Sequence, residues 1–359
     1  MRVLIAAGGT GGHIYPGIAV AKEVMRRDAS SVVRFVGTAR GLETRLVPQA
    51  GFELSLIESA GLVNMSLAER IKGLAVLPKS FLAARRLIRE FKPDIVVGAG
   101  GYVSGPVLLT ASLMRVPTLV MESNAVPGFT NRTLARFVDR AAVSFDVALP
   151  YFRGKAVVTG NPVRREFFDI PPKPRDPARF SLLLFGGSQG ARAINEAMIA
   201  ALPQLEAHKH VLAVTHQTGK LDFEKVGAGY RTAGWETQAQ VREYIDDMFA
   251  AFASADLIIS RAGATTSFEL MAAGKSALMI PLPGQLEQRR NAEAMQQAGA
   301  ARMILQEELT GERLATEIAA LVAAPERVTE MEHASRKLAR RDAAEASVDL
   351  MEKLVASSQ

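Results

Sequence analysis

The sequence has 359 residues, which is more than one hydrophobic core usually supports, so two domains of roughly 150 to 200 residues each are expected. A hydrophobic fraction of 48% and a charged fraction of 22% are typical of globular proteins and exclude disordered and collagen-like classes. The absence of cysteine excludes disulfides, a thiolate nucleophile and cysteine-based metal sites, and the net charge of +6 indicates an anionic partner.

The chain opens with an apolar run, Val3 to Ala7, followed by the glycine-rich turn Gly8-Gly9-Thr10-Gly11-Gly12. The run is too short for a signal peptide, and no apolar run is long enough to span a membrane, so the chain is expected to be mature as written. Glycines between a strand and a helix let the backbone approach a ligand, and free amides at a helix N-terminus bind anions. The alternative is a tight turn without a ligand. A dinucleotide site is not expected, because Gly37-Thr38 stands where an acidic ribose ligand would follow Val36.

His13 follows this turn directly, at the carboxyl end of the first expected strand. An imidazole at that position suits a general base, and the alternative is a histidine that caps the turn. The histidines at 208, 210 and 216 lack partners at metal-ligand spacing, and the sequence has no Asp-x-Asp, so neither a metal nor another cofactor is expected.

Most of the net positive charge lies between Asn64 and Lys92, a stretch that contains seven basic residues and two acidic ones. Apolar residues recur there at helical intervals on either side of Pro78, which is typical of a helix at a membrane interface. The alternative is an amphipathic pair of helices that buries these residues in the core. Nucleic acid is not the expected partner, because few aromatic residues are interleaved with the basic ones. The apolar and basic residues of this pattern are Leu67, Ile71, Leu74, Leu77, Phe81, Leu82, Arg70, Lys72, Lys79, Arg85, Arg86 and Arg89.

Short apolar runs alternate with helical patterns along the whole chain, which predicts parallel βαβ units. The rhythm restarts after the proline-rich stretch 171–177, so the architecture is duplicated. We expect an N-terminal domain over residues 1–163 and a C-terminal domain over 164–341, with a last helix at about 342–359 that packs back on the first domain. The expected strands are Val3–Ala7, Val32–Val36, Ile95–Val97, Thr118–Met121, Ala156–Thr159, Ser181–Phe185, Val211–Thr215, Leu257–Ser260 and Ala277–Ile280.

The second half has its own glycine cluster, Gly186-Gly187-Ser188-Gln189-Gly190, between a strand and a helix. This pattern fits the nucleophile elbow of an α/β serine hydrolase, which is the alternative function. A hydrolase also needs a late histidine, and His333 lies in a heavily charged stretch typical of a surface. We favour a loop in which Ser188 and neighbouring amides bind a diphosphate.

Thr266-Ser267-Phe268-Glu269 reads as a capping box, with Thr266 as the N-cap and Glu269 at the third helical position. The alternative is that the Glu269 carboxylate accepts both hydroxyls of a ribose beside a helix N-terminus.

Four glycine-containing motifs stand out along the chain: Gly8 to Pro16, Gly98 to Pro106, Gly160 to Arg164 and Gly186 to Arg192. Together they resemble the MurG family of bacterial peptidoglycan glycosyltransferases, and similarity continues in order over nearly the whole chain. The further positions that match are Tyr244-Ile245-Asp246-Asp247-Met248, Ser260-Arg261-Ala262-Gly263-Ala264 with Glu269, and Gln288 before Asn291-Ala292.

The resemblance implies a GT-B fold, an α/β architecture of two doubly wound Rossmann-like domains with an interdomain cleft. It implies inverting transfer of N-acetylglucosamine from UDP-N-acetylglucosamine to the 4-hydroxyl of undecaprenyl-diphosphate-linked muramyl-pentapeptide, without a cofactor. The enzyme would act at the cytoplasmic face of the cell membrane as a peripheral protein, with an anionic membrane surface as a partner.

Matching positions assign roles to individual residues. His13 would be the base, and Thr10, Gly11 and Gly12 would line the reaction centre. Ile245 would hold uracil through its backbone. The other substrate-binding positions would be Asn124, Arg164, Ser188, Ala264, Thr265, Thr266, Ser267, Phe268, Glu269 and Gln288. One departure is that Met121-Glu122-Ser123-Asn124 stands where the family pattern is His-Glu-Gln-Asn.

Overall fold

A computed structural model describes residues 1–59, 67–187 and 189–358, without the side chains of residues 67–76. The chain divides into two compact units. Unit 1 comprises Met1–Arg164 with Arg340–Gln359, and unit 2 comprises Arg165–Ala339. The first division lies directly beside the boundary expected from the sequence. Among the described residues, no helix has the length and apolar character needed to cross a membrane.

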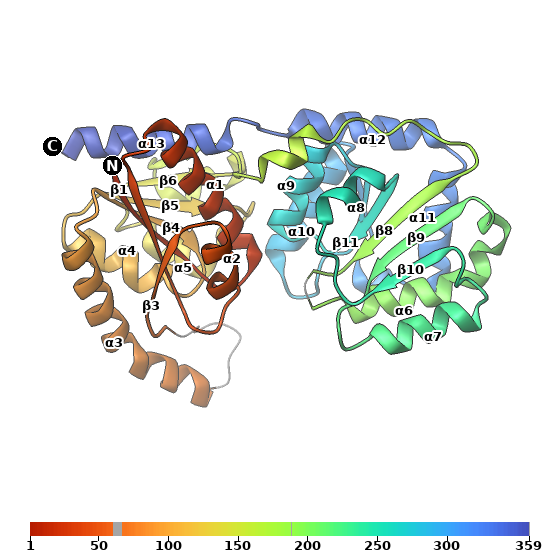
Figure 1. Cartoon of the computed structure of the whole chain (residues 1–359), viewed down its shortest axis with the longest axis horizontal. Coiled ribbons are helices and arrows are strands. Elements are labelled where there is room, and N and C mark those ends of the chain that lie inside the picture. The colour runs from red at the N-terminus through yellow and green to blue at the C-terminus, as the bar shows by residue number, and fades with distance from the viewer. Residues whose placement is uncertain (60–66, 188, 359) are drawn as a thin grey trace. The chain divides into compact units, whose positions relative to one another are not determined.

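Unit 1 contains a parallel sheet of seven strands in the order β3-β2-β1-β4-β5-β6-β7, with helices on both faces (Figure 1). The chain leaves β1 toward one edge and returns at β4 toward the other, so the topological switch point lies between β1 and β4. The strands are β1 (Arg2–Ala7), β2 (Val32–Gly37), β3 (Glu53–Leu56), β4 (Ile95–Gly100), β5 (Thr118–Glu122), β6 (Arg140–Val143) and β7 (Ala156–Val158). The helices are α1 (Gly11–Arg27), α2 (Glu43–Gln49), α3 (Leu67–Phe91), α4 (Ser104–Leu113), α5 (Phe129–Leu134) and α13 (Ala343–Ser358), with a 3-10 helix at Asp146–Phe152.

Unit 2 repeats the design with a parallel sheet of six strands in the order β10-β9-β8-β11-β12-β13. Its switch point lies between β8 and β11. The strands are β8 (Phe180–Phe185), β9 (Leu212–Gln217), β10 (Ala239–Arg242), β11 (Leu257–Ser260), β12 (Ala277–Met279) and β13 (Ala301–Met303). The helices are α6 (Arg192–Ala201), α7 (Phe223–Thr232), α8 (Met248–Ser254), α9 (Ala264–Ala273), α10 (Leu286–Gln297), α11 (Gly311–Val322) and α12 (Pro325–Leu338), with 3-10 helices at Arg165–Asp169, Leu202–His208 and Gln306–Glu308.

These two sheets confirm the predicted α/β class, and each strand expected from an apolar run is present, with ends that differ by at most three residues. Four further strands, β3, β6, β10 and β13, were not expected. Three of them, β3, β10 and β13, lie at sheet edges. No residue of β3 or β10 is fully buried. A strand with one face exposed to solvent needs no continuous run of apolar residues, so a search for such runs does not find it.

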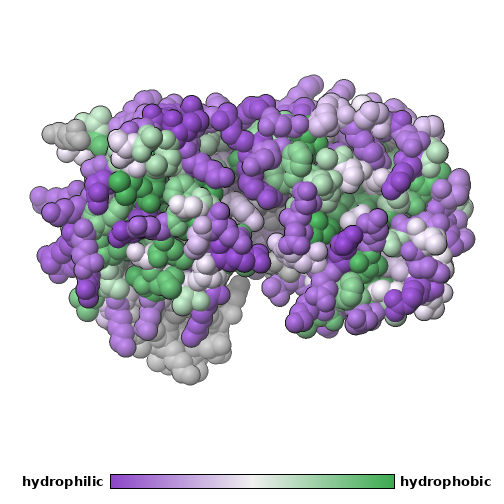
Figure 2. All heavy atoms as spheres, in the orientation of Figure 1, coloured by the Kyte–Doolittle hydropathy of each residue, from purple (hydrophilic) through white to green (hydrophobic). Residues whose placement is uncertain are grey.

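Apolar side chains are buried on both faces of the unit 1 sheet. One face is covered by α1 and α13, where Ile14 and Val348 belong to the same cluster. The other is covered by α3 and α4, which contribute Ile88 and Val107. Arg27 of α1 also pairs with Asp349 at 2.7 Å and Glu352 at 2.9 Å on α13. The last helix is therefore part of the core of unit 1. Hydrophilic side chains cover much of the face shown in Figure 2, with apolar residues between them.

Helix α3 runs without interruption through Pro78, where the core interpretation had expected a pair of helices. Proline removes one backbone hydrogen bond, but burial of one face of the helix offsets that loss. Ala84, Leu87 and Phe91 are buried in the core on this face.

A buried charge network fixes the proline-rich stretch, residues 171–177, to the rest of unit 2. Asp256, 2% exposed, accepts hydrogen bonds from Lys173 Nζ at 2.5 Å, Arg175 Nη1 at 2.8 Å and the Ser181 amide at 2.7 Å. Arg175 also pairs with Glu332 of α12. A buried carboxylate of this kind is favourable because all of its partners are in place.

Replacement of Asp256 by alanine should therefore destabilise unit 2 by about 3 to 5 kcal/mol, since it leaves the partly buried Lys173 without its carboxylate partner and Arg175 with only one of its two. Calorimetric unfolding of the purified protein measures this. The control is Glu206→Ala, which removes an exposed carboxylate 3.2 Å from Lys209 and should cost less than about 1 kcal/mol. Equal losses in the two variants would contradict a stabilising role for the network.

Candidate active site

The glycine-rich turn after β1 leads into the N-terminus of α1, at the switch point of the unit 1 sheet. Thr10 is the N-cap residue and makes no side-chain cap hydrogen bond within the described chain, and the first turn contains no acidic residue. Gly11, Gly12 and His13 are the first three helical residues. The amides of this first turn lie at the positive end of the helix, where an anion or a developing negative charge is stabilised.

Glu43 holds this turn in shape, a role that sequence reasoning missed. Its fully buried carboxylate accepts the Gly9 amide at 2.9 Å and the Thr38 amide and hydroxyl, each at 2.8 Å. A Cβ atom at Gly37 or Gly41 would come within 2.5 or 1.9 Å of Glu43. Gly37 and Gly41 leave space for the Glu43 side chain. These two glycines, six and two residues before the glutamate, are the sequence signal that could have indicated its role.

His13 lies over Gly100 at the end of β4, the other strand of the switch point. A Cβ atom at Gly100 would come within 2.1 Å of the imidazole Nδ1, so glycine is required for this packing. Burial lowers the pKa of His13 from its usual 6.5, while a hydrogen bond to the Ala99 carbonyl and the charge of Glu43 act in the opposite direction. The lowered pKa favours the neutral imidazole, the form that can accept a proton.

Glu122, at the end of β5, organises the loop that carries Asn124. Its buried carboxylate accepts the Asn124 amide at 2.8 Å, Asn124 Nδ2 at 3.0 Å, the Gly128 amide at 3.1 Å and Asn131 Nδ2 at 2.9 Å. Burial raises the pKa of Glu122, and these hydrogen bonds oppose that shift. The Asn124 side chain is thus held in one orientation.

The departure from the family pattern lies on buried positions beside Glu122. Met121 is 3% exposed and belongs to the core of unit 1. Ser123 is buried and donates to Asn161 Oδ1 at 2.6 Å. These two side chains face inward, so they support the loop from beneath.

Arg164 is the last residue of the first segment of unit 1. Its guanidinium lies 4.7 Å from the centre of the Tyr15 ring of α1, a cation–π contact. This contact brings a fixed positive charge to the helix that carries His13.

In unit 2, three loops meet beyond the carboxyl ends of β8, β9 and β10. The Gly187 carbonyl accepts the Gly190 amide at 2.9 Å and Gln217 Nε2 at 2.9 Å. Gln217 Oε1 in turn accepts the Ile245 amide at 2.9 Å. Ser188 lies outside the described residues, so the structure does not describe the serine of the proposed diphosphate loop or of the hydrolase elbow.

Helix α9 begins at Ala264 with Gly263 as its N-cap, directly after β11 at the switch point of unit 2. The predicted capping box is therefore wrong: Thr266 is the third helical residue and Glu269 the sixth, which is too far along the helix to cap it. Thr265 and Thr266 remain half-buried, whereas Ser267, Phe268 and Glu269 are buried. The glycine at 263 adopts the extended conformation that an N-cap requires, and this decided the helix start.

The predicted position Gln288 and the late histidine of the hydrolase alternative, His333, lie on other helices. Gln288 of α10 accepts the Leu282 amide at 3.0 Å through Oε1. His333 is exposed on α12, as its charged surroundings indicated.

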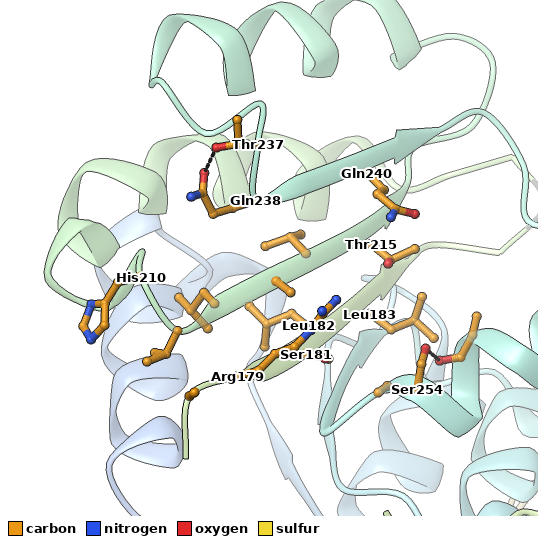
Figure 3. Close-up of a pocket in the computed structure, with 17 residues that line it drawn as sticks. Arg179, Ser181, Leu182, Leu183, His210, Thr215, Thr237, Gln238, Gln240 and Ser254 are labelled. Carbon is orange, nitrogen blue, oxygen red and sulfur yellow. Dashed lines mark hydrogen bonds between the residues drawn. The ribbon is translucent and has the colours of Figure 1, made fainter. Parts of the chain in front are cut away.

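Figure 3 shows a pocket of about 360 Å³ on one face of the unit 2 sheet, lined from β8, β9 and β10 by residues such as Ser181, Thr215 and Gln240. Ser181 lies near the start of β8, whereas the glycine loop follows its end. None of the predicted site residues lines this pocket. The residues singled out from the sequence instead gather at the carboxyl ends of the strands in each unit.

Comparison with known proteins gives the family. The N-terminal domain model of glycosyltransferase family 28 matches residues 3–143, and the C-terminal domain model matches residues 181–347. A UDP-N-acetylglucosamine--N-acetylmuramyl-(pentapeptide) pyrophosphoryl-undecaprenol N-acetylglucosamine transferase of Anaeromyxobacter sp. (strain Fw109-5) is 48% identical, over 99% of this chain and 94% of that protein. The transferase of the same name from Citrifermentans bemidjiense is 45% identical, over 98% of this chain and 99% of that protein.

The crystal structure of Acinetobacter baumannii MurG matches with a TM-score of 0.79 and 34% identity, over 98% of this chain and 99% of that chain. A UDP-N-acetylglucosamine 2-epimerase from Neisseria meningitidis shares the fold at 14% identity, with a TM-score of 0.72 over 98% of this chain and all of the other. These matches give no support to the serine hydrolase alternative. The chain therefore belongs to glycosyltransferase family 28, as an N-acetylglucosaminyltransferase of the MurG type.

Proposed function

We propose that this chain transfers N-acetylglucosamine from UDP-N-acetylglucosamine to the 4-hydroxyl of undecaprenyl-diphosphate-linked N-acetylmuramyl-pentapeptide, with inversion at the anomeric carbon. Relatives named for this reaction match nearly the full chain. The structural observation that carries the proposal is the position of His13 on the first turn of α1, over Gly100 and at the switch point where doubly wound sheets bind ligands.

Unit 2 is proposed to bind the donor. The backbone of Ile245 would meet the uracil, and the buried Glu269 would accept the ribose hydroxyls. The N-terminus of α9, from Ala264 through Ser267, would face the diphosphate and sugar with its amides. Ser188 and Arg164 would contact the diphosphate, and Asn124 and Gln288 the sugar.

The chemistry follows from the protonation state of His13. The neutral imidazole accepts the proton of the 4-hydroxyl as that oxygen bonds to the anomeric carbon. The bond between the anomeric carbon and the UDP oxygen breaks, and its electron pair leaves with the diphosphate. Helix N-terminal amides and the Arg164 guanidinium stabilise the negative charge that develops there.

The undecaprenyl chain of the acceptor keeps it in a bilayer, so the enzyme must reach a membrane surface. Helix α3 is the proposed contact. Lys79, Leu82, Arg85 and Arg89 are exposed on it, with Leu82 at 67%, while Arg86 pairs with Glu90 at 2.7 Å. The side chains of Leu67, Arg70, Ile71, Lys72 and Leu74, also named in this pattern, lie outside the described part of the chain. Exposed cations around an exposed apolar side chain suit an anionic leaflet.

Replacement of His13 by alanine should lower the transfer rate by roughly 10²- to 10⁴-fold, the usual loss when a general base is removed. The dissociation constant of UDP should stay within about twofold, because the donor is assigned to other residues. Transfer of labelled N-acetylglucosamine to a purified lipid-linked acceptor measures the rate, and calorimetric titration measures UDP binding. Near-normal turnover would remove His13 from this role.

The pH dependence of the wild type gives the same hypothesis a second measurement. A base works while deprotonated, and the pKa of His13 is lowered from 6.5, so activity should persist as the pH falls and be lost at a pH below 6.5. The acid limb of kcat/KM records this value. An identical acid limb in His13→Ala, measured on its residual activity, would assign the limb to another group.

Replacement of Glu269 by glutamine tests the ribose contact. Charged hydrogen bonds contribute about 1.5 to 3 kcal/mol, so UDP affinity should fall about 10- to 100-fold, with little change in the melting temperature. The control is Glu293→Gln, a half-buried carboxylate paired with Arg289 and Arg290, which should leave UDP affinity unchanged. Unaltered affinity in Glu269→Gln would refute the contact.

Membrane docking is tested by sedimentation with liposomes. Changing Lys79, Arg85, Arg86 and Arg89 to glutamine should weaken binding to anionic vesicles at low salt, because each basic residue near the leaflet contributes on the order of 1 kcal/mol. The matched control removes the same charge from exposed positions of unit 2: Lys225, Arg231, Arg313 and Lys337. Equal binding of the two variants would count against α3 as the docking surface.

A further inference from the structure

We infer that Gln217 is a positioning residue of the donor site: its side-chain amide joins the segment after β8, at Gly187, to the segment after β10, at Ile245, and fixes the spacing between them. This inference rests on the proposed function, in which these two segments bind the diphosphate and the uracil of the donor.

The position of Gln217 in the sheet makes this possible. It is the last residue of β9, which lies between β8 and β10. In the sheet register it pairs with Phe185, the last residue of β8, and with Arg242, the last residue of β10. The segments beyond those two strands therefore begin on either side of Gln217.

A primary amide suits this place because it carries a donor and an acceptor on one rigid group. Gln217 Nε2 donates to the Gly187 carbonyl at 2.9 Å, and Gln217 Oε1 accepts the Ile245 amide at 2.9 Å. The side chain is 1% exposed, so both hydrogen bonds are shielded from water. It therefore adds a side-chain link between the segments that follow β8 and β10.

The surrounding backbone allows the two segments little freedom. Gly190 has a φ of +76°, and a Cβ atom there would come within 1.8 Å of the Thr218 carbonyl. The Gly219 amide donates to the Glu243 carbonyl at 3.1 Å. The loop after β9 thus touches the loop after β8 on one side and the loop after β10 on the other, with Gln217 as the side chain that hydrogen-bonds both.

A buried polar network supports Gln217 from the neighbouring position. His216 is fully buried, and its ring nitrogens lie 3.1 Å from the Tyr230 hydroxyl and 3.0 Å from Asn195 Oδ1. Asn195 Nδ2 donates to the Thr218 carbonyl at 3.0 Å. The backbone on both sides of Gln217 is therefore anchored, so its side chain starts from a fixed point.

The consequence for donor binding is preorganisation. UDP would contact both segments at once, so its affinity depends on their spacing, whereas a ligand that meets one segment depends on it less. The Ile245 amide is already bonded to Gln217, so the backbone contact proposed for uracil would use the Ile245 carbonyl.

The test is Gln217→Met, which keeps the length of the side chain and removes both hydrogen bonds. The KM for UDP-N-acetylglucosamine should rise about 10- to 30-fold, while kcat and the KM for the lipid acceptor change less than threefold. By calorimetric titration, the affinity for UDP should fall several-fold more than the affinity for uridine. A merely structural role would lower the melting temperature and affect both ligands equally.

The matched control is Gln240→Met, on the adjacent strand β10, where the side chain lines the pocket of Figure 3 away from these loops. It should leave UDP affinity unchanged. A UDP affinity in Gln217→Met within twofold of the wild type, or equal losses for UDP and uridine, would overturn the inference.

A second measurement needs no variant. Hydrogen exchange of the unliganded wild type should show the Ile245 amide protected at least 100-fold relative to an unstructured peptide, although it lies outside any strand. Exchange at the unstructured rate would overturn the inference even if the variant failed to fold. Failure of the wild type to bind UDP, with the Ile245 amide protected, would instead refute the proposed donor site and leave the link between the two segments intact.

Discussion

Parallel strands end in backbone amides and carbonyls that the sheet leaves unpaired, and the candidate site lies among the loops that carry those groups. An unpaired buried backbone group costs about 1 to 3 kcal/mol, so loops at these ends need partners before they adopt one shape. In both units, buried side chains supply them, from the same loop in one case and from elsewhere in the chain in the other two. The side chains that do so are Glu43, Glu122 and Gln217.

This arrangement also resolves an electrostatic conflict. The proposed substrates both carry diphosphates, yet two buried glutamates lie beneath the loops of unit 1. Their carboxylates are surrounded by amide and hydroxyl donors, so their charge is used to hold backbone in place. The first turns of α1 and α9 contain no acidic residue, which leaves amide dipoles to face an anion.

His13 depends on the same architecture. Its ring can lie over the end of β4 because Gly100 has no side chain, and burial there lowers its pKa. A base beside a diphosphate would otherwise tend to be protonated by the attraction of the negative charge. Burial opposes that tendency and keeps the imidazole ready to accept a proton.

Much of the fold follows from local sequence. Apolar runs such as Val3–Ala7 and Leu257–Ser260 mark buried strands, because a parallel strand covered on both faces must be apolar throughout. Edge strands such as β3 and β10 carry polar residues at alternate positions and escape this signal. The start of α9 was misplaced because Thr266 and Glu269 fit a capping box, while Gly263, three residues earlier, fits an N-cap equally well.

The sequence by itself determined the two glycine-rich turns, the histidine after the first and the alternation of strands and helices, since each depends on residues that are neighbours along the chain. Tertiary structure decided which side chains hold these turns. Glu43 reaches Gly9 across 34 residues, Gln217 reaches Gly187 across 30, and Ile245 meets Gln217 across 28. Such contacts arise where strands distant in sequence become neighbours in a sheet, and strand order is set by long-range packing that no local pattern records.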